Sequence, residues 1–358
     1  MIYTLCYNIA MANEHSSLYQ KYRPADWKEV LGQSHVVDIL EKSIASNKVS
    51  HAYLFFGTRG TGKTSIARIF AEKLGVTSND LYEIDAASNT GVDNIRELRA
   101  SVYTLPFDSP YKVYILDEVH MLSKSAFNAL LKTLEEPPKH VIFILATTEL
   151  HKIPDTVISR CQLYTFKSPT ERILTELAQS IAKKEGVTID AGGAELIALL
   201  GDGSFRDTLG ILQKVLSYSD DKKIERAEIE KVTGAPSIDS IQGVLRALVD
   251  GSTDQAIQAI GSAEETSVDI KVFAKILISY LRIGLLLRYA PESRDNTLAS
   301  LSAGDVEFFK EMLQEKKGIF TSKTLLVFLD AYLRIDKSFV KSLPLELAII
   351  EILSNQEL

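Results

Sequence analysis

The stretch Gly57-Thr58-Arg59-Gly60-Thr61-Gly62-Lys63-Thr64 fits the pattern G-x-x-x-x-G-K-[ST]. An apolar run at Tyr53–Phe56 precedes it and predicts a strand, and a run from Ser65 to Leu74 predicts a helix directly after it. Glycines let successive backbone N–H groups turn toward phosphates, and the helix N-terminus adds partial positive charge. Lys63 can then reach the β- and γ-phosphates, and the Thr64 hydroxyl can ligate Mg²⁺. The stretch predicts a nucleoside triphosphate site; a Gly-rich turn without a ligand is the alternative.

The composition is that of a globular chain of 358 residues, of which 46% are apolar and 24% charged. This length is enough for two or three domains. The net charge of −7 argues against a uniformly basic nucleic-acid-binding surface but allows a local basic face. The two cysteines, Cys6 and Cys161, exclude a disulfide framework and a four-cysteine zinc site, and they suit a reducing compartment.

Neither of the two most apolar segments predicts a membrane-spanning helix. The first ten residues are apolar, but they lack a basic segment and are too short to span a bilayer. Met11 follows, and we expect it to be the true start and residues 1–17 to be a disordered extension. The longest apolar run, Val272–Ala290, contains three basic residues and predicts a buried bundle helix. We therefore expect a cytoplasmic protein.

Strands and helices alternate in residues 18–167, which predicts an α/β domain with a parallel five-stranded sheet between helices. The expected strands are Tyr53–Phe56, Leu81–Asp85, Val113–Leu116, Val141–Ala146 and Leu163–Phe166. After Pro169 we expect no further strands, and helices near Glu171–Glu185, Ala191–Gly201, Ser204–Tyr218 and Ala227–Thr233. The expected domains are a nucleotide-binding domain at 18–168, a small helical lid domain at 169–234 and an all-α domain at 235–358.

Two expected strands end in residues suited to phosphoryl transfer. The strand at 113–116 runs into Asp117 and Glu118, which can hold Mg²⁺ and polarise an attacking water, respectively. A carboxylate pair that caps the next helix is the alternative for these residues. The strand at 141–146 leads to Thr148, whose hydroxyl can contact a γ-phosphate, although a threonine there is more often an N-cap.

Two arginines are further candidates. Arg160 lies in Ser159-Arg160-Cys161, and arginine suits bidentate contact with phosphate oxygens. Standing alone, it would usually form a surface ion pair. Arg206 opens an expected helix in the second domain, from which it can reach back over the nucleotide.

Together these residues resemble the AAA+ ATPases and, within them, the gamma/tau subunit family of the bacterial DNA polymerase III clamp loader. The resemblance is strong over residues 18–235 and only architectural beyond, where family members carry a helical oligomerisation collar. The matching stretches are Tyr22–Pro24, Val30–Gln33, His51–Phe55, Gly57–Arg68, Glu83–Ser88, Asp117–Ser123, Phe127–Pro138, Leu145–Glu149, Ile158–Cys161 and Gly203–Asp207.

The resemblance implies ATP and Mg²⁺ as ligands and a role for each residue around them. Lys63 would bind phosphates, Thr64 and Asp117 would hold Mg²⁺, and Glu118 would be the hydrolytic base. The adenine pocket would be lined by Tyr19, Arg23, Pro24 and Val30.

The resemblance also implies residues that respond to the γ-phosphate. Thr148 would be the sensor 1 residue, and Arg206 the sensor 2 residue. Arg160 would be an arginine finger that acts in trans on ATP held by a neighbouring subunit, so that hydrolysis would depend on assembly.

The implied protein is an ATP-hydrolysing part of the DNA polymerase III holoenzyme, without a polymerase site of its own, which loads a sliding clamp onto primed DNA. The implied partners are delta, delta-prime and further gamma subunits, the clamp and primed DNA. Arg96, Arg99 and Lys124 would contact DNA or be ordinary solvated charges.

Two departures from the family are visible. Only Gly75–Asp80 separates Leu74 from Leu81, where family members commonly insert a four-cysteine zinc module, so we predict no zinc. We also expect a chain of the gamma form's length, without the long extension of the tau form.

Two alternative functions remain open. One is a replication factor C-like small subunit or a branch-migration helicase; Ala86-Ala87-Ser88 and the three-domain plan favour the loader. The other is an inert structural subunit like delta-prime, against which the intact Lys63-Thr64 and Asp117-Glu118 pairs argue.

Overall fold

The computed structural model describes residues 17–88, 91–219, 221–266, 268–290, 292, 303–314 and 319–354. These residues form two compact units. The first contains the described residues up to Ile181 together with Ile197–Gln213, and the second contains Ala182–Leu196 and the chain from Lys214 onward. The expected extension at 1–17 lies, except for Ser17, outside the described residues. The division runs through the segment 169–234, so the expected domain borders remain predictions.

A parallel five-stranded sheet forms the centre of the first unit, as predicted. Its strands are β1 (Ala52–Phe56), β2 (Leu81–Asp85), β3 (Lys112–Asp117), β4 (Val141–Thr147) and β5 (Gln162–Thr165), in the order β2-β3-β4-β1-β5. All neighbouring pairs are parallel; Phe56 lies beside Thr147 of β4, and Asp85 of β2 lies beside Asp117. The carboxyl ends of all five strands therefore meet at one edge, where ligands bind in such sheets.

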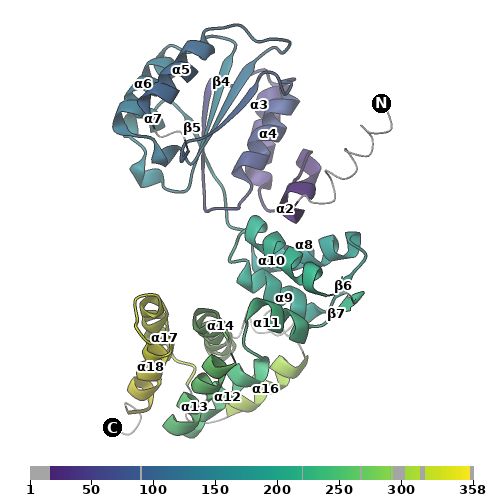
Figure 1. The fold of residues 1–358 in the computed structure, drawn as a ribbon, viewed down its shortest axis with the longest axis vertical. Helices are drawn as coiled ribbons and strands as arrows, with labels where there is room; N and C mark the ends of the chain where they lie inside the picture. Colours follow the sequence, from purple (N-terminus) through teal and green to yellow (C-terminus); the bar gives the residue numbers. More distant parts are fainter. Residues whose placement is uncertain are drawn as a thin grey trace. The chain divides into compact units, whose positions relative to one another are not determined.

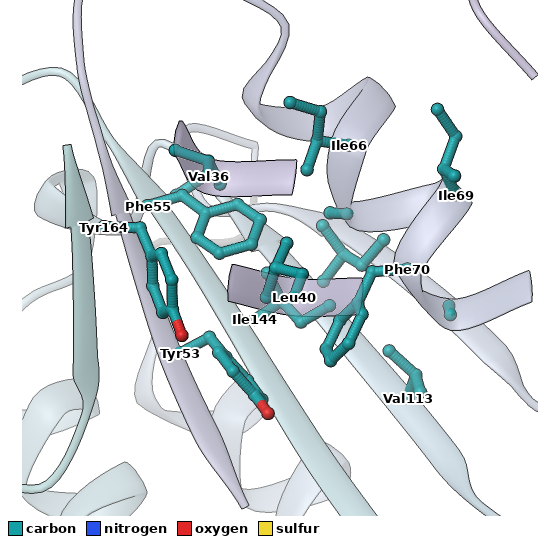
Figure 2. Packing of buried hydrophobic residues seen from close by; sticks show 14 of the residues in the cluster. Val36, Leu40, Tyr53, Phe55, Ile66, Ile69, Phe70, Val113, Ile144 and Tyr164 are labelled. Carbon is teal, nitrogen blue, oxygen red and sulfur yellow. The ribbon is translucent and has the colours of Figure 1, made fainter. Parts of the chain in front are cut away.

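Alternation along the buried strands builds two separate cores. Tyr53 and Phe55 of β1 pack on one face, whereas Ala52 and Leu54 pack on the other. Continuous apolar runs of this kind are typical of strands that are covered on both faces. In Figure 2, aromatic and aliphatic side chains of the first face interlock with those of two helices. The labelled residues are Val36, Leu40, Tyr53, Phe55, Ile66, Ile69, Phe70, Val113, Ile144 and Tyr164.

The covering helices lie on opposite faces of the sheet (Figure 1). α3 (Ser34–Ala45) and α4 (Lys63–Lys73) cover the first face; α5 (Val92–Val102), α6 (Lys124–Glu135) and α7 (Asp155–Ile158) cover the second. Short elements complete this part: α2 (Leu18–Lys21), η1 (Trp27–Glu29), η2 (Val119–Met121) and η3 (Leu150–Lys152).

After the sheet the chain is mainly helical. The elements are α8 (Glu171–Lys184), β6 (Thr188–Ile189), α9 (Ala191–Leu200), α10 (Phe205–Tyr218), β7 (Lys223–Ile224) and α11 (Arg226–Thr233). The expectation that strands stop after Pro169 is wrong, because β6 and β7 pair in parallel through Thr188 with Lys223 and Ile189 with Ile224. Two-residue strands are too short to show an alternating pattern.

The rest of the second unit is a bundle of helices. They are α12 (Ile238–Asp250), α13 (Thr253–Glu265), α14 (Ile270–Tyr289), α16 (Ala303–Gln314), α17 (Ser322–Ile335) and α18 (Leu343–Ser354). A buried carboxylate joins three of them, since Asp305 of α16 accepts hydrogen bonds from Tyr280 Oη of α14 (2.7 Å) and Gln242 Nε2 of α12 (3.3 Å). α14 is the bundle helix expected at 272–290. Among the described residues, no helix is long and apolar enough to cross a membrane.

Candidate nucleotide-binding site

The phosphate-loop pattern occupies the turn between β1 and α4. Gly60 and Gly62 have φ angles of 74° and 97°, which favour glycine. Lys63 begins α4 and is buried, and its Nζ donates to the carbonyl oxygens of Gly57 (2.8 Å) and Thr58 (2.9 Å). Burial lowers the pKa of Lys63, and the nearby carboxylates of residues 117 and 118 oppose that shift. The amine is thus held by neutral groups at the mouth of the loop.

The acidic end of β3 meets the start of α4. Thr64 Oγ1 donates to Asp117 Oδ2 at 2.8 Å, and the other oxygen, Oδ1, accepts from the backbone N–H of Glu118 at 3.0 Å. A hydroxyl and a carboxylate at this distance are the hard oxygen donors that Mg²⁺ prefers. The predicted Mg²⁺ ligands therefore lie together and fit that ion.

Glu118 has an unusual backbone conformation. Its φ of 48° and ψ of 43° are left-handed, which is uncommon for a residue with a side chain and concentrates at functional sites. Its Oε2 accepts a hydrogen bond from Thr148 Oγ1 at 3.2 Å. The strand ends thus bring the predicted base and the predicted sensor 1 residue into contact.

A pocket of about 980 Å³, counting its open mouth, lies over the phosphate loop. The predicted adenine-pocket residues Tyr19, Arg23, Pro24 and Val30 all line it. So do residues 59–65, Asp117 and Glu118, whereas Gly57 and Thr58 do not. Arg23 Nε donates to Ser65 Oγ at 3.1 Å, and burial, followed by the nearby Arg68, lowers the pKa of Arg23.

The two candidate arginines occupy different places. Arg206, near the start of α10, lines the pocket, and its guanidinium carbon lies 5.3 Å from the centre of the Tyr19 ring. Arg160 does not line it. Instead, its guanidinium contacts Glu135 Oε1 and the Thr156 carbonyl oxygen, both at 2.7 Å.

Several residues near the site were not predicted from the sequence. Gln33 is buried, and its Nε2 donates to the carbonyl oxygens of Lys167 (2.6 Å) and Thr61 (3.4 Å). Its place in the quoted stretch Val30–Gln33 was the only signal. The pocket is also lined by Tyr22, Glu29, Leu31, Ile66, Leu177, Phe205 and Leu209. Leu177 and Leu209 carry no local signal beyond helical periodicity.

The remaining expected residues lie away from this pocket. Arg99 is half-buried on α5, and Lys124 is exposed at the start of α6. The side chain of Arg96 lies outside the described part. Where the side chains are described, no group of three or more His, Cys, Asp or Glu residues is placed to hold a metal ion. The absence of zinc remains a prediction.

The chain is similar to known proteins in sequence and in fold. Residues 32–87 and 75–170 match a family model described as DNA polymerase III, delta subunit. The chain is similar to the Thermotoga maritima RuvB Holliday junction branch migration motor, with a TM-score of 0.51 and 22% identity. That match covers 64% of this chain and 80% of the RuvB chain, and at this identity it concerns the fold alone.

Curated relatives are more similar in sequence. The chain is 42% identical over 299 residues to DNA polymerase III subunit tau of Bacillus subtilis (strain 168), a match that covers 77% of this chain and 53% of that protein. It is 36% identical over 287 residues to DNA polymerase III subunit gamma of Buchnera aphidicola subsp. Baizongia pistaciae, covering 74% of this chain and 76% of that protein. The fold and the site define an AAA+ P-loop domain. The chain belongs to the DNA polymerase III subunit gamma/tau family, and it spans about half the length of several curated relatives.

Proposed function

We propose that this chain is an ATP-hydrolysing subunit of a DNA polymerase III clamp loader, which loads a sliding clamp onto primed DNA in the cytoplasm. One observation carries the proposal. A single pocket collects the phosphate-loop amine of Lys63, the bonded pair Thr64 and Asp117, and the carboxylate of Glu118. Phosphoryl transfer needs little beyond such positioning and charge neutralisation.

Each residue has a defined task in this proposal. The backbone N–H groups of the loop and the Lys63 amine bind the phosphates, and the amine exchanges its carbonyl partners for phosphate oxygens. Mg²⁺, held by Thr64 and Asp117, would neutralise charge on the β- and γ-phosphates. Glu118 accepts the proton of the attacking water, and Thr148 orients that carboxylate.

Arg160 is proposed to act on the nucleotide of a neighbouring subunit. It does not line the pocket of its own chain, and its guanidinium is held at Glu135 on α6. That ion pair is partly exposed, so it is weak enough to yield to a phosphate group. Hydrolysis would then require assembly.

The helices α17 and α18 offer a surface for that assembly. α17 exposes Leu326, Leu329 and Leu333, and α18 exposes Leu343 and Leu347, at spacings that put each set on one helical face. The two helices pack on each other. Exposed apolar stripes of this kind mark interaction surfaces. We propose that residues 235–358 form the collar through which further gamma copies and the delta and delta-prime subunits associate, and that 169–234 is the lid.

The test is ATP hydrolysis by the reconstituted loader with its clamp and primed DNA. Glu118→Gln should bind ATP normally and hydrolyse it about 10²–10⁴-fold more slowly, since it removes the general base. Lys63→Ala should lose both binding and hydrolysis. Arg172→Ala is the control, because Arg172 forms only a well-exposed ion pair with Glu176 on α8. DNA-stimulated hydrolysis that survives Lys63→Ala would refute the enzymatic function.

The trans role of Arg160 has its own test. Arg160→Ala should leave ATP binding intact and lower hydrolysis in the assembled loader by about 10³–10⁵-fold. Native mass spectrometry of the chain, alone and mixed with the other subunits, reports whether the variant still assembles. A loss of ATP binding equal to that of Lys63→Ala would remove the trans role.

A further inference from the structure

His120 lies beside the proposed base and has no role in the function described above. It belongs to η2, two residues after Glu118, and its side chain is only 6% exposed. On one side of the ring, Nδ1 lies 3.1 Å from Thr147 Oγ1 and 3.4 Å from Glu118 Oε2. On the other side, Nε2 lies 3.4 Å from Glu149 Oε1. A buried ring with a polar partner at each nitrogen is held in one orientation.

The partners of His120 are themselves fixed. Thr147 Oγ1 accepts a hydrogen bond from the backbone N–H of Glu149 at 3.0 Å. The Glu149 carboxylate lies 2.8 Å from Lys152 Nζ and 3.6 Å from His151 Nε2. These contacts anchor the ring to the end of β4 and to η3, the segment that leads toward Arg160.

The orientation of the Glu118 carboxylate depends on contacts with neighbouring side chains. Glu118 has a left-handed backbone conformation directly after β3, and its carboxylate is partly exposed. Thr148 Oγ1 and His120 Nδ1 both approach the same oxygen, Oε2. Thr148 donates a hydrogen bond to that oxygen and His120 Nδ1 lies within ion-pair distance of it, which leaves Oε1 as the oxygen that can accept a proton from water.

We propose that His120 is a positioning residue that, together with Thr148, fixes Glu118 Oε2 so that Oε1 faces the attacking water. The proposal rests on the proposed ATP hydrolysis and adds a residue to its machinery. His120 does not line the nucleotide pocket, so it should affect turnover and leave nucleotide affinity unchanged.

The test uses three substitutions that separate the two ring nitrogens. His120→Ala removes both contacts. His120→Asn places an amide where Nδ1 lies and retains the contact with Glu118, whereas His120→Gln places an amide where Nε2 lies and retains only the contact with Glu149. His151→Ala is the matched control, because His151 also contacts Glu149 but its side chain is 75% exposed. The reconstituted loader, with clamp and primed DNA, is assayed for kcat, and a fluorescent ATP analogue measures nucleotide affinity.

We expect His120→Ala and His120→Gln to lower kcat about 10- to 100-fold at unchanged nucleotide affinity, as is typical when an orienting partner is lost. His120→Asn should restore most of the activity, and His151→Ala should match the unmodified protein. With Glu118→Gln still slowing hydrolysis as expected, the positioning role would be overturned by normal turnover in His120→Ala, by equal losses in all three variants, or by rescue with glutamine instead of asparagine. A loader in which the unmodified chain hydrolyses no ATP would overturn the proposed function and this inference together.

Discussion

Replacing Gly60 with alanine should destabilise the first unit and weaken nucleotide binding more than the same change at Gly62. Both glycines have positive φ, so an alanine at either position costs about 1–2 kcal/mol. Their surroundings differ. A Cβ at Gly60 would lie 2.0 Å from Ser204 Oγ and 2.9 Å from Ser204 Cβ, whereas a Cβ at Gly62 meets nothing within 4 Å.

The clash matters because Gly60 is tied to the start of α10. The Phe205 N–H donates to the Gly60 carbonyl at 2.9 Å, and Ser204 Oγ accepts from the Asp207 N–H at 3.2 Å as an N-cap bond. Moving Ser204 aside loosens the helix that carries Arg206. Overpacking of this kind adds about 1–3 kcal/mol, so Gly60→Ala should cost roughly 2–5 kcal/mol in total.

Thermal unfolding and ATP affinity of the two variants provide the measurement. The extra 1–3 kcal/mol predicts a melting temperature about 2–12 °C lower for Gly60→Ala than for Gly62→Ala. Adding Ser204→Gly to Gly60→Ala removes both clashing atoms and costs only a few tenths of a kcal/mol as a cap, so it should recover most of that difference. Equal melting temperatures for the two alanine variants, or no recovery in the double variant, would refute the steric argument.

Three further predictions concern other parts of the chain. Burial alone would raise the pKa of Asp80, but hydrogen bonds from the backbone N–H groups of residues 107–109 lower that pKa from an ordinary 3.8 to about 2. The stabilisation that the ionised carboxylate contributes is therefore complete above pH 4 and is lost as the pH falls toward 2. In urea unfolding, Asp80→Asn should flatten the dependence of the free energy of unfolding on pH over that window. Burial raises the pKa of the Cys161 thiol from 9.0 to about 12, so its thiolate fraction at pH 8 is about 1,000-fold lower and mass spectrometry should find it unmodified by iodoacetamide until the protein unfolds. Gly284→Ala should destabilise the second unit by about 1–3 kcal/mol in a thermal unfolding experiment, because its Cβ would lie 2.2 Å from the Phe320 ring. The control is Gly243→Ala, in open space on α12. It should be neutral or stabilise the unit by about 0.5–1 kcal/mol.

The sequence predicts the three central strands closely because β1, β3 and β4 are almost continuous apolar runs. The run at Tyr53–Phe56, for example, was extended by only one residue in the structure, to Ala52–Phe56. The start of α4 was placed at Ser65 instead of Lys63, since the phosphate-loop pattern hides where helical geometry begins. The strands β6 and β7 are not predicted because each is only two residues long and shows no alternating pattern.

The residues of the candidate site likewise include some that the sequence predicts and some that it does not. Lys63, Thr64 and Asp117 are predicted because fixed patterns encode them, and the structure brings Thr64 within hydrogen-bonding distance of Asp117 although the two lie 53 positions apart. His120 and Gln33 were not assigned, because their importance depends on partners from other elements. A polar side chain in a motif says nothing of its partner until the tertiary structure brings that partner close.

The phosphate loop is fastened to the rest of the first unit by side chains that do not touch a phosphate. Gln33 Nε2 holds the carbonyl oxygens of Thr61 and Lys167, and Thr58 Oγ1 lies 2.9 Å from Ser168 Oγ. The loop is therefore coupled directly to the segment that follows β5, as well as to α10 through Gly60. A ligand shifts a conformational equilibrium only through contacts that differ between the two states. When Lys63 exchanges its carbonyl partners for phosphate oxygens, its hydrogen bonds to Gly57 and Thr58 are lost, so these contacts differ between the two states. Gly57 and Thr58 are also the loop residues that contact Phe166 and Ser168. Nucleotide binding can therefore affect the segment that connects β5 to α8 through residues that are already in contact.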